Sequence, residues 1–242
     1  MRCPLKPEPL DIYRGRDPVL IPCYGIAEAA HWLGLPAATV RNWLLGWHYK
    51  TGAGPQFSER LIELADQESR LLSFQNLIEV YVLGAIRRKY EVQMPAIRRA
   101  LQFLCDEFGS THPLSEEQMH TDGTSLLVER YGQLINVSQR GQLEMRELLE
   151  RSLKRIDRDP TGVPRRLFPF TSRRLEEERR PVSIDPRVQF GRPCLAGKGI
   201  PTDAIIDRFR AGDTIADIAE DYGQATIDIE EAIRYEEQGA AA

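Results

Sequence analysis

The sequence predicts a mainly α-helical protein with a helical module near each end and a small α+β hairpin region between them. Three observations predict this fold class. Apolar residues recur every three to four positions along most of the chain, which is typical of amphipathic helices. Residues 24–50 and 202–237 each divide into short helical patterns separated by glycine-containing turns. Alternating apolar residues of the strand type are confined to 125–137 and 166–170.

The composition indicates an ordinary globular protein. The chain has 242 residues, of which 42% are apolar and 28% charged, and this length suits one to two domains. No apolar run is long enough to span a bilayer and the N-terminus has no apolar signal core, so we expect a cytoplasmic protein without a membrane partner. Four scattered cysteines form no Cys-x-x-Cys pair, which favours reduced thiols over a metal site. No motif requires a cofactor.

Residues 1–21 are Pro-rich and polar, and we expect them to form a loosely held N-terminal arm. The next segment, 22–108, is predicted to be a helical domain that begins with two short helices. The first covers 25–33, a turn follows at 34–36, and the second begins at Ala37. The residues expected to share the core of this module are Ile26, Ala29, Ala30, Leu33, Leu35, Val40 and Trp43.

The second helix opens with Thr39-Val40-Arg41-Asn42-Trp43. This run resembles the start of the second helix in the MerR-like helix-turn-helix, which reads hydroxyl-apolar-Arg-x-aromatic. The residues from Trp47 to Lys50 and the Gly52/Gly54 turn stand where that family has its wing. The resemblance implies that the second helix enters the major groove of DNA. The residues predicted to contact DNA are Thr39, Arg41, Asn42, Trp47, His48, Tyr49 and Lys50.

A purely structural helical unit is the competing interpretation of this module. Residues 37–50 contain Arg41 and Lys50 and no acidic residue, which favours DNA binding. Arginine can pair with guanine or phosphate, and asparagine can pair with adenine.

Residues 59–108 are predicted to be helical throughout, with one apolar face over 74–86 and a second helix that follows Pro95 and ends at Gly109. Two roles stay open for the basic residues of this segment, contact with DNA phosphates or a solvated basic face: Arg87, Arg88, Lys89, Arg98 and Arg99. The apolar faces of 74–108 are candidates for a homodimer contact, because helix-turn-helix proteins usually bind paired half-sites as two-fold dimers.

Residues 109–172 are predicted to form the small α+β region. Its expected elements are a hairpin with strands at 125–129 and 133–137, a helix over 143–151, a turn at 159–162 and a strand over 166–170. A charged linker, 173–181, then leads to a C-terminal domain, 182–242.

The C-terminal domain contains three helical patterns. The turn at 211–212 ends the first helix, and Asp213 or Thr214 can cap the second. Gly223 ends the second helix and Thr226 can cap the third. Three short helices with a tight turn between the last two predict a helix-turn-helix-like domain.

The C-terminal domain contains four short runs that occur in a set order and spacing: Ile184-Asp185-Pro186, Gly191-Arg192-Pro193, the GKGIP run at 197–201, and Ala211-Gly212 before Ile215–Tyr222. Together they resemble a small domain family of formally unknown function. That family commonly forms the C-terminal part of VapB-type antitoxins, the partners of PIN-domain ribonucleases. The resemblance implies an antitoxin of a type II toxin–antitoxin system that binds operator DNA, neutralises such a ribonuclease and catalyses nothing itself.

Arginines near the linker are the candidates for holding this toxin. A PIN-type ribonuclease gathers carboxylates around a metal, and the planar guanidinium can bind a carboxylate with two hydrogen bonds. The predicted toxin-binding residues are Arg165, Arg166, Arg173, Arg174, Arg179, Arg180 and Arg192. Internal pairing of these arginines with Glu176 to Glu178 is the alternative. The third C-terminal helix, 225–237, carries five acidic residues and one arginine, which favours protein binding or dimerisation over DNA reading.

Two other functions stay open. The first is a stand-alone MerR-like transcription regulator whose middle domain binds a small effector; a ribonuclease gene next to this one would favour the antitoxin instead. The second is an enzyme, such as a nuclease, with a site assembled across domains. No Ser/His/Asp or paired-carboxylate arrangement stands out, and the glycine-rich run at 191–199 departs from phosphate-loop spacing.

Overall fold

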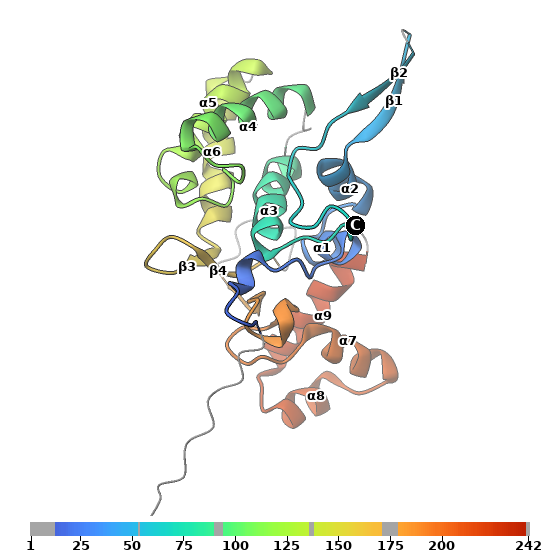
Figure 1. The fold of residues 1–242 in the computed structure, drawn as a ribbon. Helices are drawn as coiled ribbons and strands as arrows, with labels where there is room; N and C mark the ends of the chain where they lie inside the picture. The colour runs from blue at the N-terminus through green and yellow to red at the C-terminus, as the bar shows by residue number, and fades with distance from the viewer. Residues whose placement is uncertain (1–12, 53, 90–93, 136–137, 171–178, 241–242) are drawn as a thin grey trace, which may run out of the picture.

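The structure is a computed structural model that describes residues 13–52, 54–89, 94–135, 138–170 and 179–240. It confirms the mainly α-helical class, with only two-stranded sheets in these ranges. A central helix, α3 (Phe74–Lys89), separates α1 (Ile26–Trp32) and α2 (Ala37–Leu45) from the helices α4 to α6 (Figure 1). The C-terminal helices α7 to α9 lie below both groups in this view.

Helix α3 is the centre of the main core. It is apolar on nearly all sides, as expected of a helix enclosed by other elements. Its buried apolar residues are Phe74, Leu77, Ile78, Val80, Tyr81, Val82, Leu83, Ala85 and Ile86. Helix α4 (Met94–Phe108) likewise buries Ile97, Leu101 and Leu104. The prediction that the apolar faces of 74–108 form a dimer contact is therefore wrong, because this chain's own core uses them.

The predicted hairpin over 125–137 is also wrong for the residues that the structure describes, 125–135; residues 136 and 137 lie outside them. Residues Gly123–Leu134 form the helix α5, which packs on α6 (Gln139–Leu153). The buried residues of α5 include Thr124, Leu127, Val128 and Tyr131, at helical spacing. Gly132, which suggested a turn, is a close approach of two helices: a Cβ there would lie 2.8 Å from Cγ of Gln142.

The hairpin of the central region comes later in the chain. Strands β3 (Ile156–Arg158) and β4 (Pro164–Leu167) pair antiparallel, and the predicted turn at 159–162 joins them. The Asp159 carboxylate accepts hydrogen bonds from the Thr161 and Val163 amides, which explains why this sequence turns here. The predicted helix over 143–151 is confirmed as part of α6.

Two predicted features near the N-terminus need correction. Residues 59–73 are irregular rather than helical, because the Asn76 side chain accepts hydrogen bonds from the amides of Ala65 and Ser73 and so holds the chain in a loop. Residues 13–20 are not loosely held. They contain the 3-10 helix η1 (Pro18–Leu20), Val19 is only 2% exposed, and the Tyr13 hydroxyl donates to the Pro186 carbonyl at 2.6 Å. Residues 1–12 lie outside the described residues.

The C-terminal domain has a small apolar core of its own. Strands β5 (Val182–Ser183) and β6 (Cys194–Leu195) form a short ladder ahead of α7 (Thr202–Ala211), α8 (Ile215–Tyr222) and α9 (Thr226–Ala240). Gly212 and Gly223 adopt left-handed conformations at the ends of α7 and α8, and Thr214 caps α8, as predicted. Thr226 begins α9 rather than preceding it. The core residues are Leu195, Ile205, Ile206, Ile218, Ala219, Ile229, Ala232 and Ile233.

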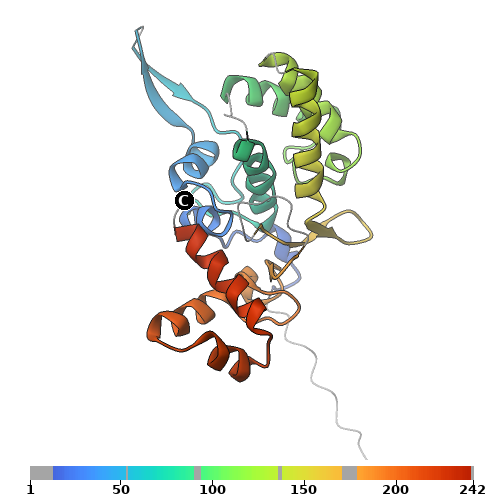
Figure 2. The same cartoon turned by 180° about the vertical axis from the view of Figure 1, so that it is seen from behind.

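Several contacts join this domain to the rest of the chain. Helix α9 packs against α1, and the two lie side by side in both views (Figures 1 and 2). Leu167 and Ile184 exchange two backbone hydrogen bonds. The buried Arg155 side chain donates to the carbonyls of Phe168 and Pro169 and to that of Arg179. The domain is therefore seated on the main core rather than merely tethered to it.

The described parts of the chain contain three free cysteines, Cys23, Cys105 and Cys194. Of the helices in these parts, none combines the length and apolar character that a bilayer span requires.

Candidate nucleic-acid interface

The N-terminal module forms a helix-turn-helix around a small core. Ala29 and Ala30 of α1 face Val40 and Trp43 of α2, and each of these residues is at most 2% exposed. Small residues on α1 allow the two helices to approach closely, while the large Trp43 fills the space beneath α2. The opposite face of α2, with Ala37, Ala38 and Arg41, is exposed. The module thus presents the first turns of its second helix to solvent.

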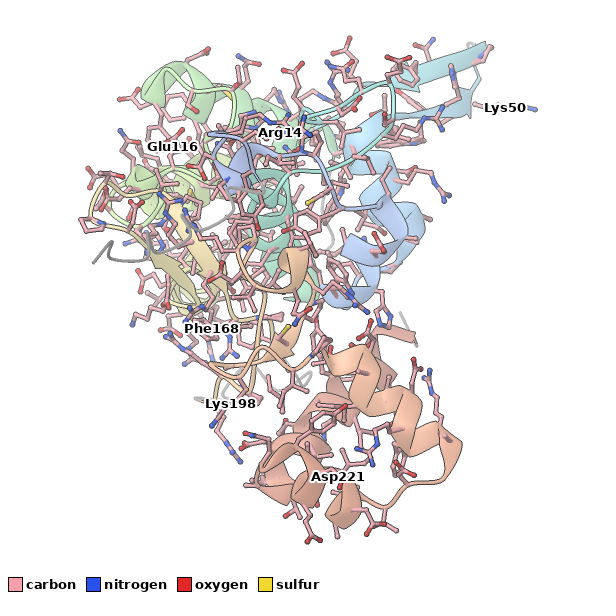
Figure 3. All side chains as sticks on the ribbon, turned by 60° about the horizontal axis from the view of Figure 1, so that its bottom comes forward. Arg14, Lys50, Glu116, Phe168, Lys198 and Asp221 are labelled. Carbon is pink, nitrogen blue, oxygen red and sulfur yellow. The ribbon has the colours of Figure 1, made fainter. Side chains whose placement is uncertain are left out.

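The predicted wing is an antiparallel hairpin. Strand β1 (Trp47–Thr51) pairs with β2 (Gly54–Ser58), with Trp47 opposite Ser58 and His48 opposite Phe57. The hairpin extends away from the helices beside α2 (Figure 1), and Figure 3 shows Lys50 projecting from it. The helix and the wing therefore offer two neighbouring contact elements, as in winged helix-turn-helix folds.

Helix α4 fixes the base of this wing. The Arg98 guanidinium donates to Ser58 Oγ at 3.0 Å and to the Glu59 carbonyl at 2.5 Å. The amides of Leu61 and Ile62 donate to the Trp43 carbonyl at the end of α2. Arg98 was one of the residues open to phosphate contact, and in the structure its guanidinium instead makes these contacts with the chain. Arg87 and Arg99 are exposed.

The seven residues predicted to contact DNA lie on these two elements. Arg41, His48, Tyr49 and Lys50 are exposed, whereas Thr39, Asn42 and Trp47 are half-buried. Arg41 and Lys50 form no ion pair with any residue in the described ranges, so both charges are available to a partner. No acidic residue occurs between Glu28 and Glu59. This face is therefore electropositive on a chain whose net charge is −4.

Phe57 is a further surface residue of the wing that the sequence did not single out. Its side chain is 50% exposed, and its ring centroid lies 4.8 Å from that of His48. Aromatic rings next to cationic side chains can contact sugars and bases as well as protein. The alternation of side chains along β2 would have indicated that Phe57 is at the surface, but only once its pairing with His48 was known.

Helix α9 supports the module from behind. The His31 Nε2 atom of α1 lies 2.8 Å from the Glu236 carboxylate of α9, and the Tyr235 hydroxyl donates to the Trp32 carbonyl at 2.8 Å. The hydrogen bond to Glu236 raises the pKa of His31 above its usual value of 6.5, against the effects of burial and of Arg210. The acidic third helix therefore meets, within its own chain, a histidine whose protonated form it stabilises.

This contact predicts a pH-dependent stability. A raised pKa means that the contribution of His31 is fully present below about pH 6.5 and is lost as the pH rises through the folded-state pKa. We expect His31→Gln to cost about 1 kcal/mol of unfolding free energy at pH 6 and less at pH 9. Urea unfolding of both proteins across this range measures the difference. For Glu236→Gln too, the difference in unfolding free energy from the wild type should become smaller as the pH rises. A difference that stays constant with pH would contradict the prediction.

Two family models match the chain, one toward each end. Residues 22–101 match a family described as "Putative DNA-binding HTH domain", and residues 182–235 match one described as "Protein of unknown function (DUF433)". A Mycobacterium tuberculosis protein named "Putative antitoxin VapB45" is 29% identical over 232 residues, which cover 88% of this chain and 93% of the relative. The predicted resemblance to VapB-type antitoxins is confirmed.

A solved structure shares the fold of this chain. The chain is similar to the X-ray crystal structure of Rv2018 from Mycobacterium tuberculosis, with a TM-score of 0.61 and 24% sequence identity. The match covers 88% of this chain and 97% of that one. At this identity the likeness establishes the common fold and nothing finer.

The arginines predicted to bind the toxin are spread along the junction of the two cores. Arg173 and Arg174, and the glutamates expected to pair with them, lie outside the described residues. The other five form ion pairs with aspartates from other parts of the chain: Arg165 with Asp159 and Asp17, Arg166 with Asp185, Arg179 with Asp228, Arg180 with Asp157, and Arg192 with Asp203. The structure brings Arg179 and Arg180 together with Lys198 around a hollow of about 310 Å³, which Asp228 also lines.

A second hollow, of about 510 Å³, lies between η1, the segment 115–121 and the β3–β4 turn. Asp17, Glu116 and Glu117 make its lining acidic, and Gln75 and Ser115 add neutral polar groups. Within the described residues, no group of three His, Cys, Asp or Glu side chains could hold a metal ion.

Proposed function

We propose that this protein is an antitoxin that binds operator DNA through its N-terminal module and neutralises a PIN-domain ribonuclease through its C-terminal domain. The observation that carries the proposal is the match to the VapB45 antitoxin, because it runs through both modules over 88% of the chain. The exposed face of α2 and the wing supports the DNA-binding part. In this proposal the protein acts by binding and carries out no catalysis.

Operator recognition requires that α2 enter the major groove while the wing follows the backbone. Arg41 is then positioned to reach a base edge or a phosphate, and Asn42 a base edge. Lys50, His48 and Tyr49 on the wing contact phosphates and sugars. Paired half-sites call for a two-fold dimer, whose contact surface lies outside the buried faces of α3 and α4.

Arg41→Ala is expected to weaken operator binding by about 1–3 kcal/mol if Arg41 contacts a base. Gel shifts at one fixed salt concentration measure the change. Arg140→Ala is the matched control, because Arg140 on α6 is 89% exposed and its removal changes the net charge equally. The idea fails if the two variants bind equally well while the circular dichroism of both matches the wild type.

The proposed toxin contact draws on the hollow lined by Arg179, Arg180 and Lys198. A metal-binding ribonuclease site is rich in carboxylates, and arginine binds carboxylates in a two-pronged geometry. The ion pairs that now hold these arginines lie at the surface: Arg179 is 52% exposed and Arg180 is 40% exposed. Exposed pairs contribute little to stability and can exchange one carboxylate for another. Arg165, Arg166, Arg173, Arg174 and Arg192 complete the proposed set.

An effector-binding regulator is the second candidate, and the acidic hollow of about 510 Å³ favours it. Such a lining would suit a cationic effector. Co-expression with the protein encoded by the neighbouring gene separates the two functions. Co-purification of a ribonuclease whose activity is suppressed supports the antitoxin, and the absence of any such complex favours the regulator.

A further inference from the structure

The turn η3 (Gln189–Gly191) has an unusual backbone. Gln189, Phe190 and Gly191 follow one another with φ values of 48°, 55° and 78°. The left-handed region is disfavoured for residues with a side chain, and for a bulky residue such as phenylalanine it is a genuine outlier. Strained backbone of this kind persists only where surrounding contacts impose it, and it concentrates at functional sites.

The surrounding contacts hold this turn firmly. The amides of Gly191 and Arg192 donate to the carbonyls of Val188 and Gln189 at 2.9 and 3.2 Å. The Gln189 side-chain amide donates to the Gly199 carbonyl at 3.3 Å. Gly191 is buried against Tyr24 of the main core. The turn is therefore fixed before any partner arrives.

The strained turn presents its aromatic side chain to solvent. Phe190 is 72% exposed, more than any other large apolar side chain in the part of the chain that the structure describes. An exposed phenylalanine contributes little to folding, so folding alone gives no reason to hold it in a disfavoured conformation. Preorganised aromatic side chains commonly anchor protein–protein interfaces.

The charged residues of the segment around Phe190 are opposite in sign to the net charge of its domain. Residues 182–242 carry 6 basic and 12 acidic side chains, a net charge of −6. Between Asp185 and Asp203, however, the charged residues are Arg187, Arg192 and Lys198, and none is acidic. The first two are 42% and 50% exposed, and Figure 3 shows Lys198 extending from the ribbon. Each arginine is paired at the surface with an aspartate from outside this segment, Arg187 with Asp17 at 4.0 Å and Arg192 with Asp203, and exposed pairs of this kind contribute little to stability and can exchange one carboxylate for another.

We infer that Phe190 is the anchor of the toxin contact and inserts into an apolar pocket bordered by carboxylates on the ribonuclease. The cations of the same segment, Arg187, Arg192 and Lys198, complement those carboxylates, with the two arginines exchanging their present partners Asp17 and Asp203 for carboxylates of the toxin. Lys198 also lines the hollow formed by Arg179 and Arg180, so the same lysine belongs to both parts of the proposed contact. This inference rests on the proposed antitoxin function and adds to it the residue that contributes most to affinity.

The test measures binding of the full-length protein to the purified ribonuclease encoded by the neighbouring gene. Phe190→Ala is expected to weaken binding by at least about 30-fold, the range of an interface hot spot. Leu143→Ala is the matched control, because Leu143 on α6 is also an exposed apolar residue, at 56%, and should change binding less than twofold. Equal binding by wild type and Phe190→Ala overturns the inference while leaving the antitoxin function intact. No binding by the wild type overturns both.

A second variant separates binding from folding. Phe190→Gly removes the side chain and relieves the left-handed strain, so Tm is expected to stay the same or to rise by about 2 °C while toxin binding falls as for Phe190→Ala. A lower Tm together with weaker binding would assign Phe190 a structural role and overturn the inference. Operator affinity should change less than twofold in both variants. A matching loss of operator affinity would identify nucleic acid as the occupant of this surface and would also overturn it.

Discussion

Arg155→Ala is expected to lower the free energy of unfolding by about 3 kcal/mol. Arg155 is 4% exposed, and its guanidinium lies 4.4 Å from the centre of the Phe170 ring. It donates to the carbonyls of Phe168 at 2.7 Å and Pro169 at 3.1 Å, and both of these residues are buried. Each buried acceptor left without a donor costs about 1–3 kcal/mol. Urea denaturation of the full-length protein measures the loss.

The matched control for this variant is Arg151→Ala. Arg151 lies in the last turn of α6, shortly before Arg155, and is exposed, so its removal should change the unfolding free energy by less than about 0.5 kcal/mol. Arg155 also donates to the Arg179 carbonyl at 3.1 Å, at the entry to the C-terminal domain. If the two alanine variants prove equally stable, Arg155 does not hold this junction.

Gly191→Ala is expected to be similarly destabilising, by about 3 kcal/mol. A left-handed alanine costs roughly 1–2 kcal/mol, and here φ is 78°. The new methyl group would also lie 2.0 Å from the Tyr24 hydroxyl oxygen, and overpacking of this kind costs a further 1–3 kcal/mol or so. Thermal or urea unfolding gives the total.

Gly197→Ala separates the two causes. Gly197 has nearly the same φ, 74°, but nothing lies within 4 Å of its added Cβ. This variant should therefore lose only the roughly 1–2 kcal/mol of backbone strain. Tyr24→Phe removes the nearest atom and should recover part of the excess cost in a double-mutant cycle. Equal losses of unfolding free energy in the two glycine variants would mean that Tyr24 moves aside without an energetic penalty.

Local signals predicted the two end modules well. The left-handed glycines at 212 and 223 and the hydroxyl cap at Thr214 act within one or two residues, so their neighbours in sequence are their neighbours in space. The hairpin prediction over 125–137 failed because Gly132 resembles a turn when α6, which packs against it, is unknown. The dimer contact failed for the same reason, since periodicity shows that a face is apolar but not what covers it.

In the candidate site, too, residues that belong to a local sequence pattern could be predicted, and contacts between distant residues could not. Arg41, Asn42 and Lys50 belong to a continuous pattern and could be predicted, although their contact with DNA stays a prediction. The hydrogen bond from Arg98 to Ser58 at the base of the wing joins residues 40 positions apart, and no local sequence pattern indicates it. The exposure of Phe190 depends on two left-handed residues, a conformation that the residue types at 189 and 190 argue against.

Under the proposed function, the packing of α9 on α1 links the module that would bind operator DNA to the domain that would bind the toxin. In that proposal operator DNA contacts α2 and the wing, while α9, from the proposed toxin-binding domain, packs against α1. A toxin that alters this packing changes the affinity for the operator, and thermodynamic reciprocity requires the operator to change the affinity for the toxin by the same factor. Couplings of this kind typically amount to about 5–150-fold. The strength of the contact between His31 and Glu236 would then set the size of this coupling, and with it how strongly repression depends on the amount of toxin.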